Sequence, residues 1–182
     1  MEHCRRMGRP RHDGINWPLL WTLGIVVTIS LRVWSLWSQL PDTMGSHYGL
    51  SGRADSYMSK EGFFLFMALV GGGTLAALFA SSALIRRLPP SLINLPNRSY
   101  WLASDERREI AIGRISELMG GMGVATAALL AVATELAMQA NIHRTNFDNR
   151  TFIIVMVAYM GYAVYVLIRK IRLLKVPDAP QT

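Results

Sequence analysis

Hydrophobic residues gather in four long blocks that are separated by polar segments. The blocks cover residues 17–40, 62–85, 113–140 and 151–168, and each is close to the roughly 20 residues that an α-helix needs to cross about 30 Å of hydrocarbon. Most charged side chains stand between the blocks rather than within them. The pattern therefore predicts an all-α membrane protein, a bundle of four transmembrane helices.

The same pattern divides the chain into four parts. We expect a basic tail at residues 1–16, helices 1 and 2 with their connections at 17–112, helices 3 and 4 at 113–168, and a second basic tail at 169–182. The first block follows several arginines, as a signal-peptide core does, but its apolar run is longer and no small-residue cleavage site ends it. We therefore expect this block to be retained as a membrane helix.

Composition and charge agree with this interpretation. Of the 182 residues, 51% are hydrophobic and 17% are charged, which is more apolar than an ordinary soluble domain. The net charge of +7 does not indicate nucleic-acid binding, because the basic residues lie beside the apolar blocks rather than on a separate domain. Fourteen Lys and Arg residues lie in the two tails and the middle connection, against four in the other two connections. The positive-inside rule therefore predicts cytoplasmic termini and an outer connection between helices 1 and 2.

Two isolated charges are expected within the membrane, Arg32 in the first helix and Glu135 in the third. Because these helices run in the same direction, both side chains should reach similar depths near the outer boundary. Ionisable groups inside membranes usually face the protein interior and pair. We therefore expect an Arg32–Glu135 ion pair inside the bundle. The single cysteine, Cys4, lies in the first tail, so no intramolecular disulfide can form.

Small residues in the third helix indicate a packing face. Glu117 and Glu135 are 18 residues apart, which at 100° per residue returns to the same face. Gly120 and Gly121 lie between them on that side. Small side chains let neighbouring backbones approach closely, so we expect this face to pack against other helices.

The middle connection leads into the third helix. Ser104 is expected to be its N-cap, because a serine hydroxyl can accept from the backbone of the first turn. Tyr100 and Trp101 precede this serine, and Arg107 and Arg108 follow it. We expect these four side chains to lie at the lipid headgroups, where aromatic rings and arginines are favoured.

The connection between helices 1 and 2 is the most informative segment. Its Gly, Ser and Asp content favours turns, and we expect residues 44–48 to form a short extended segment before a turn at 49–52. The candidate ligand-binding residues are His47, Tyr48, Asp55 and Lys60, with Trp37 as an aromatic wall. The alternative is that Asp55 and Lys60 brace the loop and that the backbone satisfies His47, because ordered loops need their polar groups paired.

This connection resembles the signature of the bacterial domain-of-unknown-function 1648 family (DUF1648). The matching positions are Leu40, Pro41, His47, Tyr48, Gly52, Asp55, Ser59 and Lys60. Residues 94–102 also resemble the loop after the second helix in small members of that family. The resemblance implies a protein of the bacterial inner membrane. It also implies a relation to sporulation-delaying-protein immunity factors, which protect the producing cell from a secreted toxic peptide and signal its presence to a repressor.

The function that follows is recognition of a peptide or envelope component, of an immunity or signalling type, with no enzymatic activity. Expected partners are membrane lipid, an outer peptide ligand and a cytoplasmic regulator, and the small residues also permit homo-oligomers. One alternative is a metal-binding membrane enzyme or sensor, and another is an accessory subunit of a transporter. The polar residues considered for a zinc set are His47, His143, Asp42, Asp55, Glu135 and Asp148. Because no short-spaced ligand motif or catalytic motif accompanies them, we assign no metal, cofactor or catalytic residue.

Overall fold

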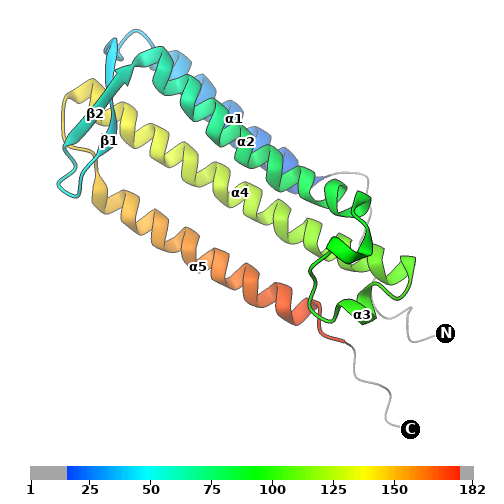
Figure 1. Cartoon of the computed structure of the whole chain (residues 1–182). Helices are drawn as coiled ribbons and strands as arrows, with labels where there is room; N and C mark the ends of the chain where they lie inside the picture. The colour runs from blue at the N-terminus through cyan, green and yellow to red at the C-terminus, as the bar shows by residue number, and fades with distance from the viewer. Residues whose placement is uncertain (1–15, 177–182) are drawn as a thin grey trace.

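The chain folds into four long helices with a β-hairpin across one end (Figure 1). The structure, a computed structural model, describes residues 16–176, so Cys4 and the outer parts of both predicted tails lie outside the described residues. The elements in chain order are α1 (Trp17–Leu36), β1 (Thr43–Tyr48), β2 (Ala54–Ser59), α2 (Lys60–Arg87), a 3-10 turn (Pro90–Leu92), α3 (Arg98–Trp101), α4 (Asp105–His143) and α5 (Asn149–Leu173). We call the end with β1 and β2 the hairpin end, and the opposite end the α3 end.

Each long helix begins with a polar side chain that accepts a hydrogen bond from the first turn. Four backbone N–H groups at a helix start have no partner within the helix, and a capping oxygen satisfies one of them. The prediction for Ser104 is confirmed, because its hydroxyl accepts from the backbone of Arg107 at 3.3 Å. The capping residues are Asn16 for α1, Ser59 for α2, Ser104 for α4 and Asp148 for α5.

Every predicted block contains a long helix, but several bounds differ. The first helix ends at Leu36 rather than at residue 40, and α5 continues to Leu173, inside the predicted tail. The predicted division at residue 112 falls within α4, which is continuous over 39 residues. At 1.5 Å per residue α4 is about 58 Å long, far more than the roughly 30 Å hydrocarbon core of a bilayer. A membrane around the helices therefore leaves part of α4 outside the hydrocarbon.

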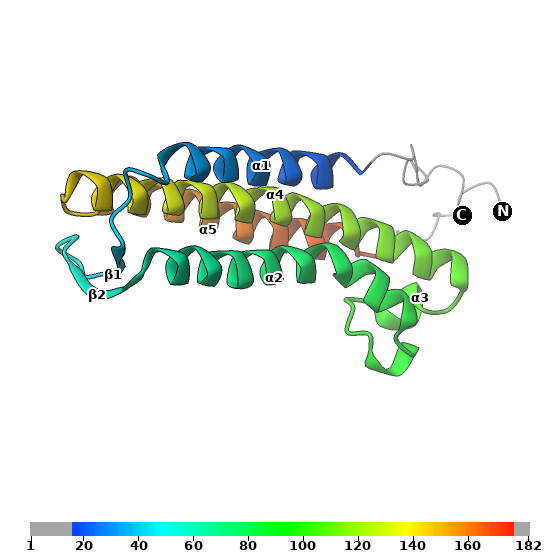
Figure 2. The same ribbon diagram turned by 90° about the horizontal axis from the view of Figure 1, so that it is seen from above.

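The helix α4 is the centre of the arrangement. The substantial helix–helix interfaces are those of α1, α2 and α5 with α4, and Figure 2 shows α1 and α2 on opposite sides of it. The expected packing of Gly120 and Gly121 is present, but they contact different helices rather than forming one shared face. The close neighbours are Pro18 of α1 at Gly120, Tyr162 of α5 at Gly121 and Phe79 of α2 at Gly123. The predicted four-helix bundle is therefore arranged as three helices around a central one.

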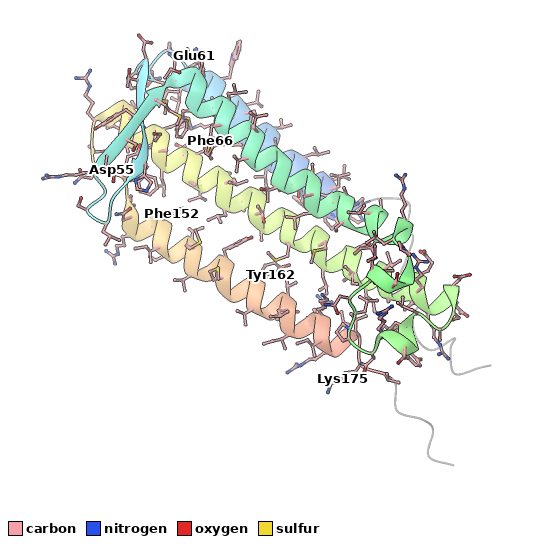
Figure 3. All side chains as sticks on the ribbon, viewed as in Figure 1. Asp55, Glu61, Phe66, Phe152, Tyr162 and Lys175 are labelled. Carbon is pink, nitrogen blue, oxygen red and sulfur yellow. The ribbon has the colours of Figure 1, made fainter. Side chains whose placement is uncertain are left out.

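The outer surface of these helices is apolar. All four long helices are long and hydrophobic enough to cross a membrane. Large hydrophobic side chains are exposed along them, including Leu31 on α1, Leu69 on α2 and Val157 on α5. Figure 3 shows side chains projecting from both sides of α5, with Tyr162 directed toward α4. Such surfaces are favourable in lipid and costly in water, so the coarse prediction of four membrane helices is confirmed.

The hairpin adds a small sheet to the predicted all-α fold. The strands β1 and β2 pair antiparallel, with Thr43 opposite Ser59 and Gly45 opposite Tyr57, and the register is irregular next to Ser46. The extended segment expected at residues 44–48 corresponds to β1, whereas β2 was not expected. Its sequence, Ala-Asp-Ser-Tyr-Met-Ser, contains several residues with low strand preference. The strand conformation of β2 is therefore stabilised by pairing with β1 rather than by the local preference of its residues.

The α3 end differs most from expectation. Trp101 is completely buried rather than placed at the membrane surface, and its indole N–H donates to the carbonyl of Leu174 at 2.8 Å. Arg108 donates to the carbonyl oxygens of Arg86 at 2.9 Å and Leu88 at 2.8 Å, where α2 ends. The prediction that Trp101 and Arg108 anchor the chain to headgroups is therefore wrong, because carbonyl groups at two helix ends bind these side chains.

Candidate functional site

The hairpin turn is held against the connection between α4 and α5. The carbonyl of Gly52 accepts from the backbone of Phe147 at 2.8 Å, and the Asn149 side chain donates to the carbonyl of Leu50 at 2.8 Å. Gly52 has φ +78°, a left-handed conformation that glycine adopts without steric cost. A Cβ at this position would lie 2.5 Å from the Phe147 carbonyl oxygen. Glycine is therefore required both by the turn and by the closeness of the two segments.

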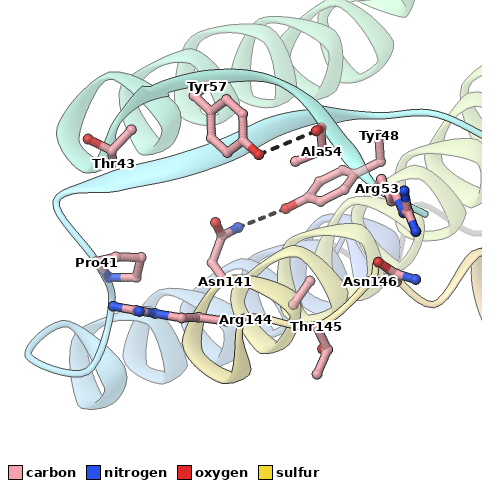
Figure 4. A pocket seen from close by; sticks show the side chains of 11 residues that line it. Pro41, Thr43, Tyr48, Arg53, Ala54, Tyr57, Asn141, Arg144, Thr145 and Asn146 are labelled. Atoms are coloured by element: carbon pink, nitrogen blue, oxygen red, sulfur yellow. Dashed lines mark hydrogen bonds between the residues drawn. The ribbon is translucent and has the colours of Figure 1, made fainter. Parts of the chain in front are cut away.

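This docking closes one side of a pocket of about 550 Å³ at the hairpin end (Figure 4). One wall comes from the hairpin, and the other comes from the last turn of α4 and the residues after it. The lining residues are Pro41, Thr43, Tyr48, Arg53, Ala54, Tyr57, Ala140, Asn141, Arg144, Thr145 and Asn146. Only Pro41, Ala54 and Ala140 among them are apolar, so the lining is largely polar.

The pocket is positively charged. Arg53 comes from the turn before β2, and Arg144 follows the last residue of α4, so two distant segments each supply a guanidinium group. The lining contains no Asp or Glu, and neither arginine has a carboxylate within ion-pair distance among residues 16–176. Both residues are exposed. Guanidinium groups bind carboxylates and phosphates through paired hydrogen bonds, so the pocket has the chemistry for an anionic group.

The backbone at Arg144 is unusual. This residue is the C-cap of α4 and has φ +52°, in the left-handed region. Glycine or asparagine is the common choice there, because other side chains crowd the backbone. Helix termination therefore does not explain why an arginine occupies this position.

The side-chain amide of Asn141 fixes the position of the residues at the floor of the pocket. The Asn141 side chain accepts from the backbone N–H of Gly45 at 2.7 Å and donates to the Tyr48 hydroxyl at 2.8 Å. The Tyr48 ring stacks on Phe147 with centroids 4.7 Å apart. Burial raises the pKa of Tyr48 above its ordinary value, although the hydrogen bond from Asn141 opposes this effect, so the hydroxyl stays neutral at pH 7. Tyr48 is therefore a fixed, uncharged polar group in the pocket.

The other three predicted binding residues lie elsewhere. His47 and Asp55 are hydrogen-bonded to each other on the outer side of the hairpin, where 71% and 54% of their side chains are exposed. Lys60 is buried, and its ammonium lies 3.4 Å from the carbonyl oxygens of both Trp37 and Leu40 and 4.9 Å from the Trp37 ring centroid. Lys60 therefore braces the junction of α1, the hairpin and α2, while Tyr48 alone of the predicted set lines the pocket.

The structure brings together the two charges expected within the membrane. Arg32 donates through Nε and Nη2 to the carboxylate of Glu135, at 3.2 and 3.1 Å, and Gln139 donates to the same carboxylate at 2.7 Å. The pair is not inside the bundle, because 47% of the Arg32 side chain and 32% of the Glu135 side chain are exposed. This exposure follows from the arrangement of helices, since α1 packs on α4 and no further helix covers the junction.

The structure also bears on the zinc alternative. Among residues 16–176, no group of three or more His, Cys, Asp or Glu side chains is arranged to hold a metal ion. Instead, His47 is bonded to Asp55, and His143 is bonded to Gln139 at 3.0 Å. The structure therefore does not bring His47 and His143 together with their candidate carboxylates into a common site.

The pocket residues that sequence reasoning missed include Arg53, Asn141 and Arg144. The two arginines were counted only as evidence of topology. The signal that was available is an arginine in each outer connection, Arg53 directly after Gly52 and Arg144 directly after His143. The sequence does not show that these connections touch, and that contact is what creates the pocket.

A chain of four long apolar helices, three of them packed around the fourth, is a multi-pass membrane protein. Residues 23–71 match the family model described as Domain of unknown function (DUF1648). The match covers most of α1, the hairpin and the first part of α2. It includes Arg53 but not Arg144. No curated protein and no solved structure matches the chain.

Proposed function

We propose that this protein recognises an anionic ligand, through the pocket at its hairpin end. The observation that carries the proposal is a pocket lined by both Arg53 and Arg144 and by no acidic side chain. The fixed hydroxyl of Tyr48 and the ring of Tyr57 add polar and apolar contacts beside the two cations. A peptide with a free carboxylate, or an envelope component with a carboxylate or phosphate, has the matching chemistry.

We further propose that the hairpin end faces away from the cytoplasm. In the structure this end carries the basic residues Arg32, Arg53, Lys60, Arg144 and Arg150. The α3 end carries the larger set, Arg86, Arg87, Arg98, Arg107, Arg108, Arg114, Arg169, Lys170, Arg172 and Lys175. Such a bias supports a cytoplasmic α3 end under the positive-inside rule. The pocket is then open to molecules outside the bacterial inner membrane.

Recognition of an outer ligand agrees with the immunity or signalling role that the family resemblance implies. In such a role the pocket binds a secreted peptide, and α4 links the pocket to the α3 end as one continuous helix. A cytoplasmic regulator is the partner that this role requires at the α3 end. The proposal needs no catalytic step and no cofactor.

The test compares the full-length protein in detergent with two variants, using tetrapeptides of mixed sequence as probes. One set of probes has free carboxyl termini and the other has amidated termini. The variant Arg144→Asn removes a guanidinium and places at φ +52° a residue that tolerates this conformation, so the helix end is preserved. The matched control is Arg150→Gln, which removes an exposed arginine that does not line the pocket.

Binding should require the free carboxylate and should weaken about tenfold in Arg144→Asn, because a charge-assisted hydrogen-bond pair is lost. The control should bind as the unmodified protein does. Equal affinity for free and amidated peptides, or equal losses in Arg144→Asn and Arg150→Gln, would contradict recognition in this pocket. Cysteine-accessibility labelling at Leu50 and Leu92 in intact cells tests the orientation separately.

A further inference from the structure

The Arg32–Glu135 pair is only partly covered by protein. Both residues lie within helices that are long and apolar enough to cross a membrane, yet 47% and 32% of their side chains are exposed. Charged groups facing hydrocarbon are costly, so they are normally met by a polar partner or by water. A molecule that covers this pair must carry a positive and a negative group at the depth of the pair, together with an apolar part that lies deeper in the membrane.

One donor of Arg32 is unused. The guanidinium has three nitrogens, of which Nε and Nη2 donate to Glu135. The third, Nη1, has no hydrogen-bond partner in the part of the chain that the structure describes. The carboxylate of Glu135 is fixed from the other side by Gln139 at 2.7 Å. The pair is therefore held rigidly while Nη1 is available to an acceptor.

An apolar groove leads away from the pair along the junction of α1 and α4. It has a volume of about 520 Å³, and its lining includes Trp21, Gly24 and Ile29 of α1. From Trp21 to Arg32 the helix rises about 16 Å, close to half of the roughly 30 Å hydrocarbon core and hence to the depth of one leaflet. Arg32 lies four residues before Leu36, the last residue of α1, or about 6 Å inside the helix end. The guanidinium thus lies near the headgroup level, at one end of a groove that is about as long as one acyl chain.

We propose that this groove binds one zwitterionic phospholipid with a primary ammonium, that is, phosphatidylethanolamine. A phosphate oxygen accepts from Arg32 Nη1, the ammonium lies against the Glu135 carboxylate, and one acyl chain lies along the groove over Gly24 and Ile29. The choice of lipid follows from charge complementarity. The pair presents one positive and one negative group, so a headgroup with both signs satisfies both. An anionic headgroup such as phosphatidylglycerol offers Glu135 no cation in addition to Arg32 and places a phosphate close to its carboxylate.

The experiment is native mass spectrometry of the full-length protein in detergent, titrated with dioleoyl phosphatidylethanolamine or dioleoyl phosphatidylglycerol. The variant Gly24→Leu fills the groove without altering the ion pair, because nothing lies within 4 Å of a Cβ added at Gly24. The matched control is Gly73→Leu on α2, where a Cβ likewise meets nothing within 4 Å and which lines neither this groove nor the apolar pocket beside Gly72. A second variant, Arg32→Gln with Glu135→Gln, removes both charges and keeps a polar side chain at each position.

The unmodified protein should retain phosphatidylethanolamine about tenfold more strongly than phosphatidylglycerol, the factor expected for one charge-assisted contact. Gly24→Leu should weaken retention of both lipids, and Gly73→Leu should behave as the unmodified protein. The double glutamine variant should lose the preference between the lipids. Equal retention of the two lipids by the unmodified protein, a preference for phosphatidylglycerol, or unchanged retention in Gly24→Leu would overturn the proposal.

Discussion

Replacing Gly52 with alanine should loosen the docking of the hairpin on the connection between α4 and α5. A non-glycine residue in the left-handed region, here at φ +78°, costs about 1–2 kcal/mol. The new Cβ would stand 2.5 Å from the carbonyl oxygen of Phe147, so the two segments must separate. Separation weakens the 2.8 Å hydrogen bond from Phe147 to Gly52, which contributes about 0.5–1.5 kcal/mol. The expected total is about 2–3 kcal/mol.

Hydrogen exchange followed by mass spectrometry in detergent measures this change where it occurs. A loss of about 2–3 kcal/mol in the docked state corresponds to exchange that is about 30- to 150-fold faster at the amide of Phe147. Exchange in the middle of α4 should not change, because docking and undocking involve only the hairpin end. A global thermal scan is less informative, since a local opening can leave the helices intact.

The control is Gly49→Ala in the same turn. Gly49 does not have a left-handed conformation, and a Cβ there would meet its nearest atom, Oδ2 of Asp55, at 3.7 Å, an ordinary van der Waals distance. Exchange at Phe147 should therefore stay close to that of the unmodified protein. If Gly52→Ala and Gly49→Ala accelerated exchange equally, the conformation and closeness of Gly52 would not be what holds the hairpin in place.

Two further predictions concern electrostatics. Glu135→Arg should lower the yield of folded protein, measured by size-exclusion chromatography, because it places a second cation beside Arg32. Adding Arg32→Glu should restore the yield. If the exchanged pair did not rescue folding, a stabilising ion pair would be contradicted. The hydroxyl and backbone N–H of Thr151 hold the pKa of Asp148 below its ordinary value. Its contribution to stability is therefore complete above the unfolded-state pKa and is lost as the pH falls through the lower folded-state pKa. Asp148→Asn should flatten the decline of the unfolding temperature between about pH 5 and pH 2, and parallel curves for the two proteins would refute this role.

The helices were predictable because lipid imposes a simple rule on sequence. A span needs about 20 apolar residues whatever its neighbours are, and a cap such as Ser104 acts within its own turn. Even the Arg32–Glu135 pair follows from local information, because two isolated charges at matching depths in parallel helices have few other partners. The exposure of the pair could not be predicted from the sequence, because the exposure depends on which helices pack against α1.

The residues that were misplaced depend on contacts between distant segments. Trp101 was expected at the membrane surface, but its N–H is bonded to a carbonyl 73 residues later in the chain. Lys60 was expected to bind a ligand, but it binds carbonyl groups at the end of α1 and just after it. Arg53 and Arg144 share a pocket only because Gly52 lies against Phe147. Local hydrophobicity and turn preference contain no information on such pairings.

The central position of α4 constrains how the protein is assembled during synthesis. The first two helices leave the ribosome before α4, and their substantial interfaces are with α4 rather than with each other. Until the third span enters the bilayer, α1 and α2 are joined mainly through the hairpin and the residues packed beneath it. A chain truncated before residue 105 should therefore insert two helices that drift apart within the lipid, and it should be a preferred target for membrane quality-control proteases.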